Sequence, residues 1–252
     1  MVELEKLRAY TDELLGVGAF QDYAPNGLQV EGRQEVGCIV AAVTASLAAI
    51  EAAIDLQADA LCVHHGYFWK HEDPCITGMK RQRLQALLQH DISLLAYHLP
   101  LDAHIRYGNN TRLAAQLDIK MVGRLDLEDT PPLVFHGELP TPMTAAEFAC
   151  HLEQRLGRVP LHLPGRSGRI RRIAWCTGGA QAYFEKLVSC GVDAYLTGEA
   201  AEQNAHTARE SGVHFFAAGH HATERYGIQA LVDHLSETFS LESHYIELDN
   251  PV

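Results

Sequence analysis

The chain has 252 residues, of which 47% are hydrophobic and 21% charged, and its formal net charge is −12 at pH 7. This length and composition fit one large or two small globular domains with a real hydrophobic core. The acidic balance argues against broad nucleic-acid binding, which needs a basic surface, but it is compatible with a small anionic substrate held by a metal ion.

The N-terminal segment, 2–16, is charged and amphipathic and predicts a helix. It lacks the apolar core of a signal peptide, and the sequence has no apolar run near the roughly 20 residues that a membrane span needs. We therefore expect a cytoplasmic protein without membrane segments.

Strand-like and helix-like segments then alternate through the first half of the chain. The expected strands are 38–46, 59–66 and 92–102, and the expected helices are 46–58, 79–91 and 109–118. Such alternation is typical of an α/β fold with a mostly parallel sheet.

The segment 124–142 changes character, because three of the ten prolines fall between 131 and 140. We interpret it as a crossing into a second domain, followed by a helix over 143–157 with Gly157 as its C-cap and a loop or weak hairpin over 160–170. The expected domains are residues 1–125 with 220–252, and an inserted domain, 126–219.

The strand–helix pattern of the first half returns in the second. Residues 172–199 align with 38–65 with a gap of about one residue, and 215–227 align with the segment from 94 to about 108. In this alignment Gly198-Glu199 falls on His64-His65, His220 on His98, and Glu224 on Asp102. Any two β-α-β units look alike to some degree, but polar residues that coincide at strand ends favour two related α/β lobes.

The six cysteines show no CxxC spacing, and in a cytoplasmic protein we expect them to be reduced and structural. They are Cys38, Cys62, Cys75, Cys150, Cys176 and Cys190.

Histidines and carboxylates gather where the expected strands end. Four strand ends carry them, namely His64-His65, His98 with Asp102, Glu199, and His220 with Glu224. Open α/β sheets bind ligands at the carboxyl ends of their strands. Imidazole and carboxylate together suit zinc, manganese, iron or nickel.

The number of ligands favours two divalent ions. Three or four histidines with two carboxylates overfill one tetrahedral site, but they suit an ion pair that shares a carboxylate and a water and lowers the pKa of that water. Neighbouring side chains of a strand point to opposite faces. His64 and His65 therefore serve one ion only if the strand has ended, and otherwise serve two.

Each motif also has a structural alternative, since His-His pairs and HxxxD or HxxxE spacings arise by chance. His104 is a candidate for contact with substrate, and His221 points away from His220. Thr177-Gly178-Gly179 fits either a small anion-binding turn or a tight turn between strand and helix. The sequence contains no GxSxG, P-loop or GxGxxG after the first strand.

Several motifs together resemble the Ngg-interacting-factor-three-like family, whose bacterial YbgI-type members are labelled GTP cyclohydrolase 1 type 2 homologs. The segments that carry the resemblance run from about residue 20 to 251 and read YAPNGLQVEG, VTAS, VHHGYFW, HLPLDAH, GNN, TGE and GHHATER. The resemblance implies two α/β domains, one inserted into the other, a dinuclear metal site, and a toroidal homohexamer built as a trimer of dimers.

Carried over residue by residue, the resemblance implies a set of five metal ligands, which are His64, His65, Asp102, His220 and Glu224. Glu224 is expected to bridge the ions and, with His98, to take a catalytic role. His98 then lies beside the site, and Glu199 and His221 become neighbours of it.

Two functions follow as hypotheses. The first is a metal-dependent hydrolase acting on a nucleotide or related heterocycle, with GTP as the named candidate. The second is a metal-loaded scaffold or metallochaperone, which is favoured by the lack of a clear basic cluster for a triphosphate. The cationic residues nearest to the motif HHGYFW are Lys70, Lys80, Arg81 and Arg83.

Overall fold

The computed structural model describes residues 1–127, 132–166 and 168–252. These divide into two compact units, Met1–Gly108 with Gly227–Asp249, and Asn109–Tyr226 with Asn250–Val252. The second unit interrupts the chain of the first, as expected for an inserted domain. The domain boundaries predicted at 125/126 and 219/220 stay predictions.

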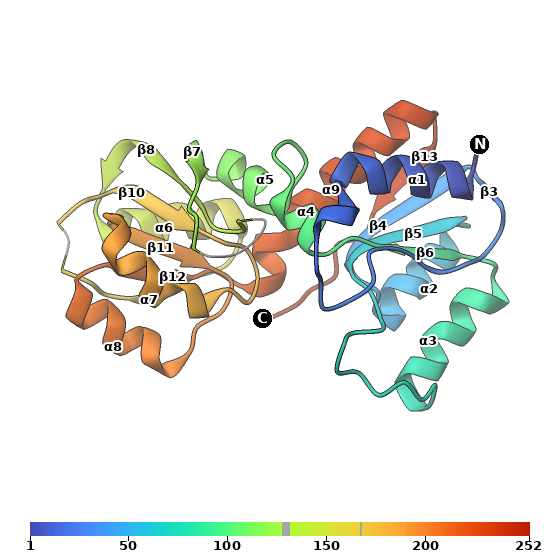
Figure 1. The fold of residues 1–252 in the computed structure, drawn as a ribbon, viewed down its shortest axis with the longest axis horizontal. Coiled ribbons are helices and arrows are strands. Elements are labelled where there is room, and N and C mark those ends of the chain that lie inside the picture. The colour runs from blue at the N-terminus through green and yellow to red at the C-terminus, as the bar shows by residue number, and fades with distance from the viewer. Residues whose placement is uncertain (128–131, 167) are drawn as a thin grey trace. The chain divides into compact units, whose positions relative to one another are not determined.

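The first unit holds one five-stranded sheet, a short β-ribbon and the helices around them (Figure 1). Its elements are β1 (Val2–Glu3), α1 (Leu4–Leu15), η1 (Val17–Ala19), β2 (Gly27–Val30), β3 (Glu35–Val36), β4 (Cys38–Thr44), α2 (Leu47–Asp55), β5 (Ala60–His65), α3 (Gly78–Gln89), β6 (Ser93–Ala96), α4 (Leu99–Ala103), most of α9 (His220–Phe239) and β13 (Glu242–Tyr245).

The five-stranded sheet has the order β13-β4-β5-β6-β2. Its first four strands are parallel, and β2 is antiparallel to β6. Apolar side chains of α1 and α9 cover one face, and those of α2 and α3 cover the other. This three-layer arrangement explains why β4 reads as a continuous apolar run, because both of its faces are buried.

The second unit holds a six-stranded sheet. Its elements are α5 (Asn109–Gln116), β7 (Lys120–Arg124), β8 (Phe135–Met143), α6 (Ala145–Leu156), β9 (Leu161–Leu163), β10 (Ile170–Trp175), η2 (Gln181–Tyr183), α7 (Phe184–Leu187), η3 (Val188–Cys190), β11 (Ala194–Thr197), α8 (Glu202–Ser211), β12 (His214–Ala217) and the first residues of α9.

The order of this sheet is β7-β8-β10-β11-β12-β9, with a parallel centre and antiparallel strands on both sides. The α/β class and the parallel core of each lobe are thus confirmed. In both units three consecutive parallel strands are followed by an antiparallel edge strand, β2 in one and β9 in the other. The expected loop or hairpin over 160–170 is this edge strand β9, and Ser167 lies outside the described residues.

The proline-bearing segment is not only a linker. It contains β8, which pairs with both β7 and β10. Pro140 and Pro142 have no backbone N–H, and they fall where the β8–β10 register shifts, between the pairs of Glu138 and Met143. Because the prolines indicated a linker, the strand β8 was not predicted from the sequence. Residues 128–131 of the segment lie outside the described residues.

The helix over 143–157 begins and ends as its sequence indicates. Thr144 and Glu147 form a capping box at its start. Gly157 closes it in the left-handed conformation at φ 71°, where glycine avoids the steric cost of a side chain.

Candidate metal centre

In the first unit, three imidazoles come together at the carboxyl ends of β5 and β6. His64 and His65 end β5, and His98 follows β6 as the residue that precedes α4. One ring nitrogen from each of the three lies within 4.8 Å of the others. The rings of His64 and His65 are only 4.5 Å apart between centroids. The two neighbours therefore approach each other, as expected if the strand ends at this point.

The imidazole of His64 is held in one tautomer by the protein backbone. It is fully buried, and its Nδ1 lies 2.8 Å from the carbonyl oxygen of Tyr97. Because a carbonyl only accepts, Nδ1 donates, and the lone pair of the neutral ring lies on Nε2. Nε2 lies 3.5 Å from Oδ1 of Asp102. Nitrogen and carboxylate oxygen thus face one another as donors for a cation.

Asp102 reaches this position from α4, the single helical turn after His98. The backbone N–H of Asp102 donates to the His98 carbonyl oxygen at 3.1 Å, which confirms helical geometry over the HxxxD spacing. The residue is only 7% exposed, so its carboxylate lies largely out of water.

His98 is oriented by the loop that contains the sequence DYAPNG. Oδ1 of Asp22 accepts a hydrogen bond from its Nδ1 at 2.7 Å, and Oδ1 of Asn26 accepts from its backbone N–H at the same distance. The other oxygen of Asp22 accepts from Leu99 N–H and from the Asn26 amide. A carboxylate behind a histidine fixes the orientation and the tautomer of the ring.

These bonds also lower the pKa of Asp22. Burial alone would raise it, but the hydrogen bond and charge of His98, together with the donors Asn26 and Leu99, outweigh burial and bring the pKa to about 2. Asp22 therefore stays ionised at neutral pH and keeps Nδ1 of His98 protonated.

The loop after β5 adds an aromatic wall beside the imidazoles. The Trp69 ring meets His98 edge to face at 5.0 Å and lies 6.0 Å from His65. Its indole N–H donates to the Gly66 carbonyl oxygen. The loop is tied down by Gln29, whose side-chain oxygen accepts from Tyr67 N–H at 2.7 Å. The motif YAPNGLQ thus supports both the histidine loop and His98.

In the second unit, His220 lies between two carboxylates at the start of α9. Its Nδ1 contacts Oε1 of Glu199 at 2.6 Å, and its Nε2 lies 3.2 Å from Oε2 of Glu224. Glu199 follows β11, and Glu224 lies one helical turn after His220. Glu199 is placed behind His220 as Asp22 is behind His98, while Glu224 is 3% exposed and faces the opposite nitrogen.

The two carboxylates raise the pKa of His220. Burial disfavours the imidazolium, but the hydrogen bonds and charges of Glu224 and Glu199 outweigh it and raise the pKa to about 9. An arrangement that attracts a proton this strongly also attracts a metal cation, which would replace that proton.

The turn after β10 packs directly against this pair. Gly178 has φ 68°, and a Cβ at this position would lie 2.0 Å from Oε1 of Glu224 and 3.0 Å from Nε2 of His220. The backbone N–H groups of Gly178 and Ala180 donate to the hydroxyls of Thr223 and Thr197. These bonds within the protein favour the tight-turn interpretation of Thr177-Gly178-Gly179 over an anion-binding turn.

The donor sets fit a metal. In each unit, imidazole nitrogen and carboxylate oxygen face one another, and oxygen acceptors behind the rings fix His64, His98 and His220. His104 contributes elsewhere, because it stacks on Tyr107 and its Nδ1 accepts from the Tyr107 backbone. Sequence reasoning missed Asp22, although it adjoins the quoted motif YAPNG.

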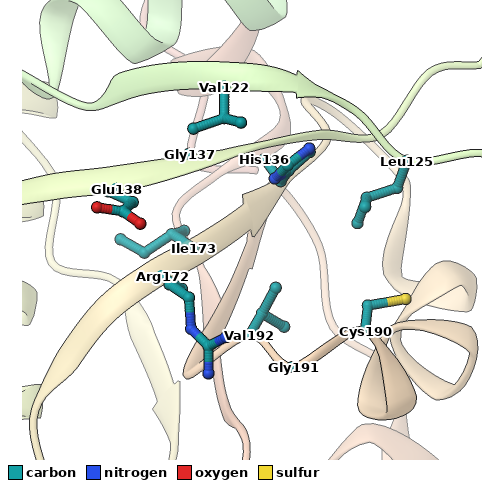
Figure 2. A pocket seen from close by; sticks show the side chains of 10 residues that line it. All are labelled: Val122, Leu125, His136, Gly137, Glu138, Arg172, Ile173, Cys190, Gly191 and Val192. Carbon is teal, nitrogen blue, oxygen red and sulfur yellow. The ribbon is translucent and has the colours of Figure 1, made fainter.

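A separate cavity of about 250 Å³ lies in the second unit, below the roughly 300–1,000 Å³ of typical ligand pockets. Figure 2 shows it lined by His136, Glu138 and Arg172 together with apolar side chains. None of the candidate metal ligands lines it, so it does not belong to the candidate centre.

None of the helices in the described part of the chain has the length and apolar character that a bilayer-spanning segment requires.

Comparisons with known proteins agree over the whole chain. A model of the family Duf34/NIF3 (NGG1p interacting factor 3) matches residues 2–251. A Pseudomonas aeruginosa protein named GTP cyclohydrolase 1 type 2 homolog is 54% identical over 250 residues, 99% of each chain. An Allochromatium vinosum protein of the same name is 52% identical over 254 residues, 100% of this chain and 98% of the relative.

Solved structures are also similar to this chain over its whole length. A structure described as protein ybgI of unknown function has a TM-score of 0.96 at 50% identity, with 100% of both chains covered. One from Thermus thermophilus has a TM-score of 0.91 at 34% identity, again over 100% of both chains. The chain therefore belongs to the Duf34/NIF3 (NGG1p interacting factor 3) family.

Proposed function

We propose that the protein binds two divalent metal ions per chain and uses them as a hydrolase of a nucleotide or related heterocycle. The proposed ligands are those the family resemblance implies, His64, His65, Asp102, His220 and Glu224, with Glu224 bridging. The observation that carries the proposal is the gathering of imidazoles in the first unit, where His64, His65 and His98 place ring nitrogens within 4.8 Å of one another.

The donor chemistry supports a pair of ions rather than one. The five proposed ligands, His64, His65, Asp102, His220 and Glu224, exceed the four positions of a single tetrahedral ion. They suit two ions that share a carboxylate and a water. The ions are zinc, iron, manganese or nickel, because imidazole and carboxylate ligands suit these metals. When bound, they supply Lewis-acid polarisation and a water of lowered pKa.

The protein's own residues would handle the proton and the substrate. Asp22 holds the proton of His98 on Nδ1, so the other ring nitrogen can accept a proton from water or deliver one to a leaving group. Trp69 and the buried surroundings of His64 limit the access of bulk water. This arrangement suits hydrolytic opening of a heterocycle, and GTP is the first substrate to test because relatives carry the name GTP cyclohydrolase 1 type 2 homolog.

The test combines two measurements on untagged protein purified without chelator. Metal content per chain is measured by elemental analysis, and a panel of nucleotides that includes GTP is screened for turnover and formate release. About two metals with formate from GTP would support the full proposal. Two metals without turnover of any nucleotide would leave the metal site and remove the nucleotide hydrolase, and failure to bind metal after reloading would remove both.

The second candidate is a metal-loaded scaffold or metallochaperone. It is favoured by the state of Lys80, one of the cationic residues that follow the motif HHGYFW. Lys80 pairs with Glu72 at 3.1 Å and donates to the Asp73 carbonyl oxygen, so its ammonium group is already engaged and is less available to a triphosphate. A carrier would transfer metal stoichiometrically to an acceptor protein, whereas a hydrolase turns over repeatedly with its metal retained.

We also propose a cytoplasmic homohexamer, a trimer of dimers, as the family resemblance implies. Sedimentation analysis of the metal-loaded protein should then give about six times the 27.8 kDa of one chain. A monomer at micromolar concentration would contradict this assembly.

A further inference from the structure

A second group of metal-binding side chains lies at the other end of the first unit's sheet. Cys38 begins β4, and Glu242 begins the neighbouring edge strand β13, where the two residues are paired in register. His244 is two residues further along β13. Since side chains alternate along a strand, Glu242 and His244 point to one face, and the registered partner Cys38 shares it.

These three side chains already bring their donor atoms together. One donor atom from each of Cys38, Glu242 and His244 lies within 4.8 Å of the others. Nε2 of His244 lies 2.9 Å from Oε1 of Glu242. The thiol is nearly buried, at 8% exposure, whereas the side chains of His244 and Glu242 are 37% and 69% exposed. A cation could therefore enter from solvent and meet a fixed sulfur.

The electrostatic surroundings favour a cation at the sulfur. The negative charges of Glu242 and Asp59 both act on the Cys38 thiol. Asp59 itself is engaged elsewhere, since its Oδ2 accepts from Gly37 and Cys38 N–H and its Oδ1 pairs with Arg33. Only Glu242 among these carboxylates is one of the three donors, and a metal ion would relieve the negative charge around the sulfur.

The group is separate from the candidate metal centre. Thr44, at the end of β4, pairs with His65, and Cys38 lies six residues before it. At a rise of roughly 3.3 Å per residue, the two ends of the strand are about 20 Å apart.

We propose that Cys38, Glu242 and His244 form a further metal site, selective for a thiophilic divalent cation of the zinc class, with a fourth position open to water. Thiolate and imidazole select zinc over magnesium or calcium. The bound ion ties the edge strand β13 to β4 through side chains in addition to the backbone ladder.

Cobalt(II) tests this site without interference from the other centre. Thiolate ligation of cobalt gives a near-ultraviolet charge-transfer absorption, and none of the proposed ligands of the candidate centre is a cysteine. Metal-free full-length protein titrated with cobalt should show this absorption, with a final intensity that corresponds to about one thiolate-bound ion per chain, and the Glu224→Ala variant should keep it. Zinc added afterwards should abolish it, whereas magnesium should not.

The variants distinguish ligation from structural effects. His244→Ala changes a partly exposed residue and should weaken cobalt binding at this site by at least about 10-fold, and Cys38→Ser should remove the absorption. Cys190→Ser and His206→Ala, which change an exposed thiol and an exposed imidazole elsewhere, should leave it intact. No thiolate absorption in the unmodified protein, or an absorption that survives in Cys38→Ser or is unaffected in His244→Ala, would overturn the proposal.

Discussion

Both units hold imidazole rings in fixed orientations, but they do so with different hydrogen-bond partners. In the first, three histidines at strand ends are oriented from behind by a carboxylate, a hydroxyl and a backbone carbonyl, supplied by Asp22, Thr44 and Tyr97. In the second, one histidine at a helix start lies between two carboxylates. The first unit is rich in imidazole nitrogens, whereas the second has more carboxylates than imidazoles around its histidine.

The strand pairing relates the donor positions of the two units. Ile39, Ala60 and Ser93 form one paired row across β4, β5 and β6, and Ile173, Ala194 and His214 form a row across β10, β11 and β12. The two rows are equivalent, because Asp59 and Asp193, which precede Ala60 and Ala194, make the same hydrogen bonds with the start of the neighbouring strand. Counted from these rows, His64 corresponds to Gly198, as in the sequence alignment, and His98 corresponds to Gly219, one residue before His220.

The largest effect is expected from removing the carboxylate of Glu224. Glu224→Ala should lower the metal content from about two ions per chain to one or fewer and reduce any hydrolytic turnover by about 100-fold or more, because the proposed bridging ligand is lost. Elemental analysis and turnover are measured on the same preparation. Glu210→Gln, on α8 of the same unit, is the control and should behave as the unmodified protein; two retained metals in Glu224→Ala would disprove the ligand assignment.

The second unit's dependence on close packing is tested at Gly178. Gly178→Ala places a methyl group against Glu224 at a backbone φ of 68°, so metal affinity should fall by about 10-fold and stability by about 1–2 kcal/mol. Calorimetric metal titration and urea unfolding measure the two effects.

The variant Gly157→Ala distinguishes the backbone strain of a positive φ from the steric clash with Glu224. Gly157 has a similar φ of 71°, but an added Cβ would meet nothing within 4 Å. This variant should lose stability and keep metal affinity. Equal metal affinities in the two variants would mean that Gly178 does not shape the candidate centre.

The first unit's dependence on a carboxylate behind the ring is tested at Asp22. Asp22→Asn removes the negative charge behind His98 and weakens the hydrogen bond that keeps the proton on Nδ1 of His98. Turnover should therefore fall by about 10-fold, with the metal content unchanged. Asp55→Asn, an exposed change on α2, is the control. A parallel loss of metal and turnover would instead make His98 a metal ligand.

Sequence reasoning reached the histidines and carboxylates because strand ends can be recognised locally. His64, His98 and His220 each follow an apolar run, and the HxxxE spacing at 220–224 predicts a shared helix face, which the structure bears out. Asp22 was missed because its role depends on a partner 76 residues away. The strand β8 was missed because Pro140 and Pro142 indicate a linker, and only the pairing register shows where a strand tolerates them.

The smallest effect expected is a pH dependence carried by Asp22. Its pKa is about 2 in the folded protein against an ordinary value of 3.8, so the folded state binds its proton less readily than the unfolded chain. The resulting stabilisation is fully present above about pH 5, about half lost near pH 3, and gone below 2. With solvent screening allowed for, its size is on the order of 1 kcal/mol.

Urea unfolding of metal-free protein at pH 5 and pH 3 should show the Asp22→Asn variant losing less stability than the unmodified protein, by roughly half of this amount. Identical losses in the two proteins would mean that the ionised carboxylate of Asp22 does not stabilise the fold through His98. Asp22 would then not play the part behind His98 that Glu199 plays behind His220.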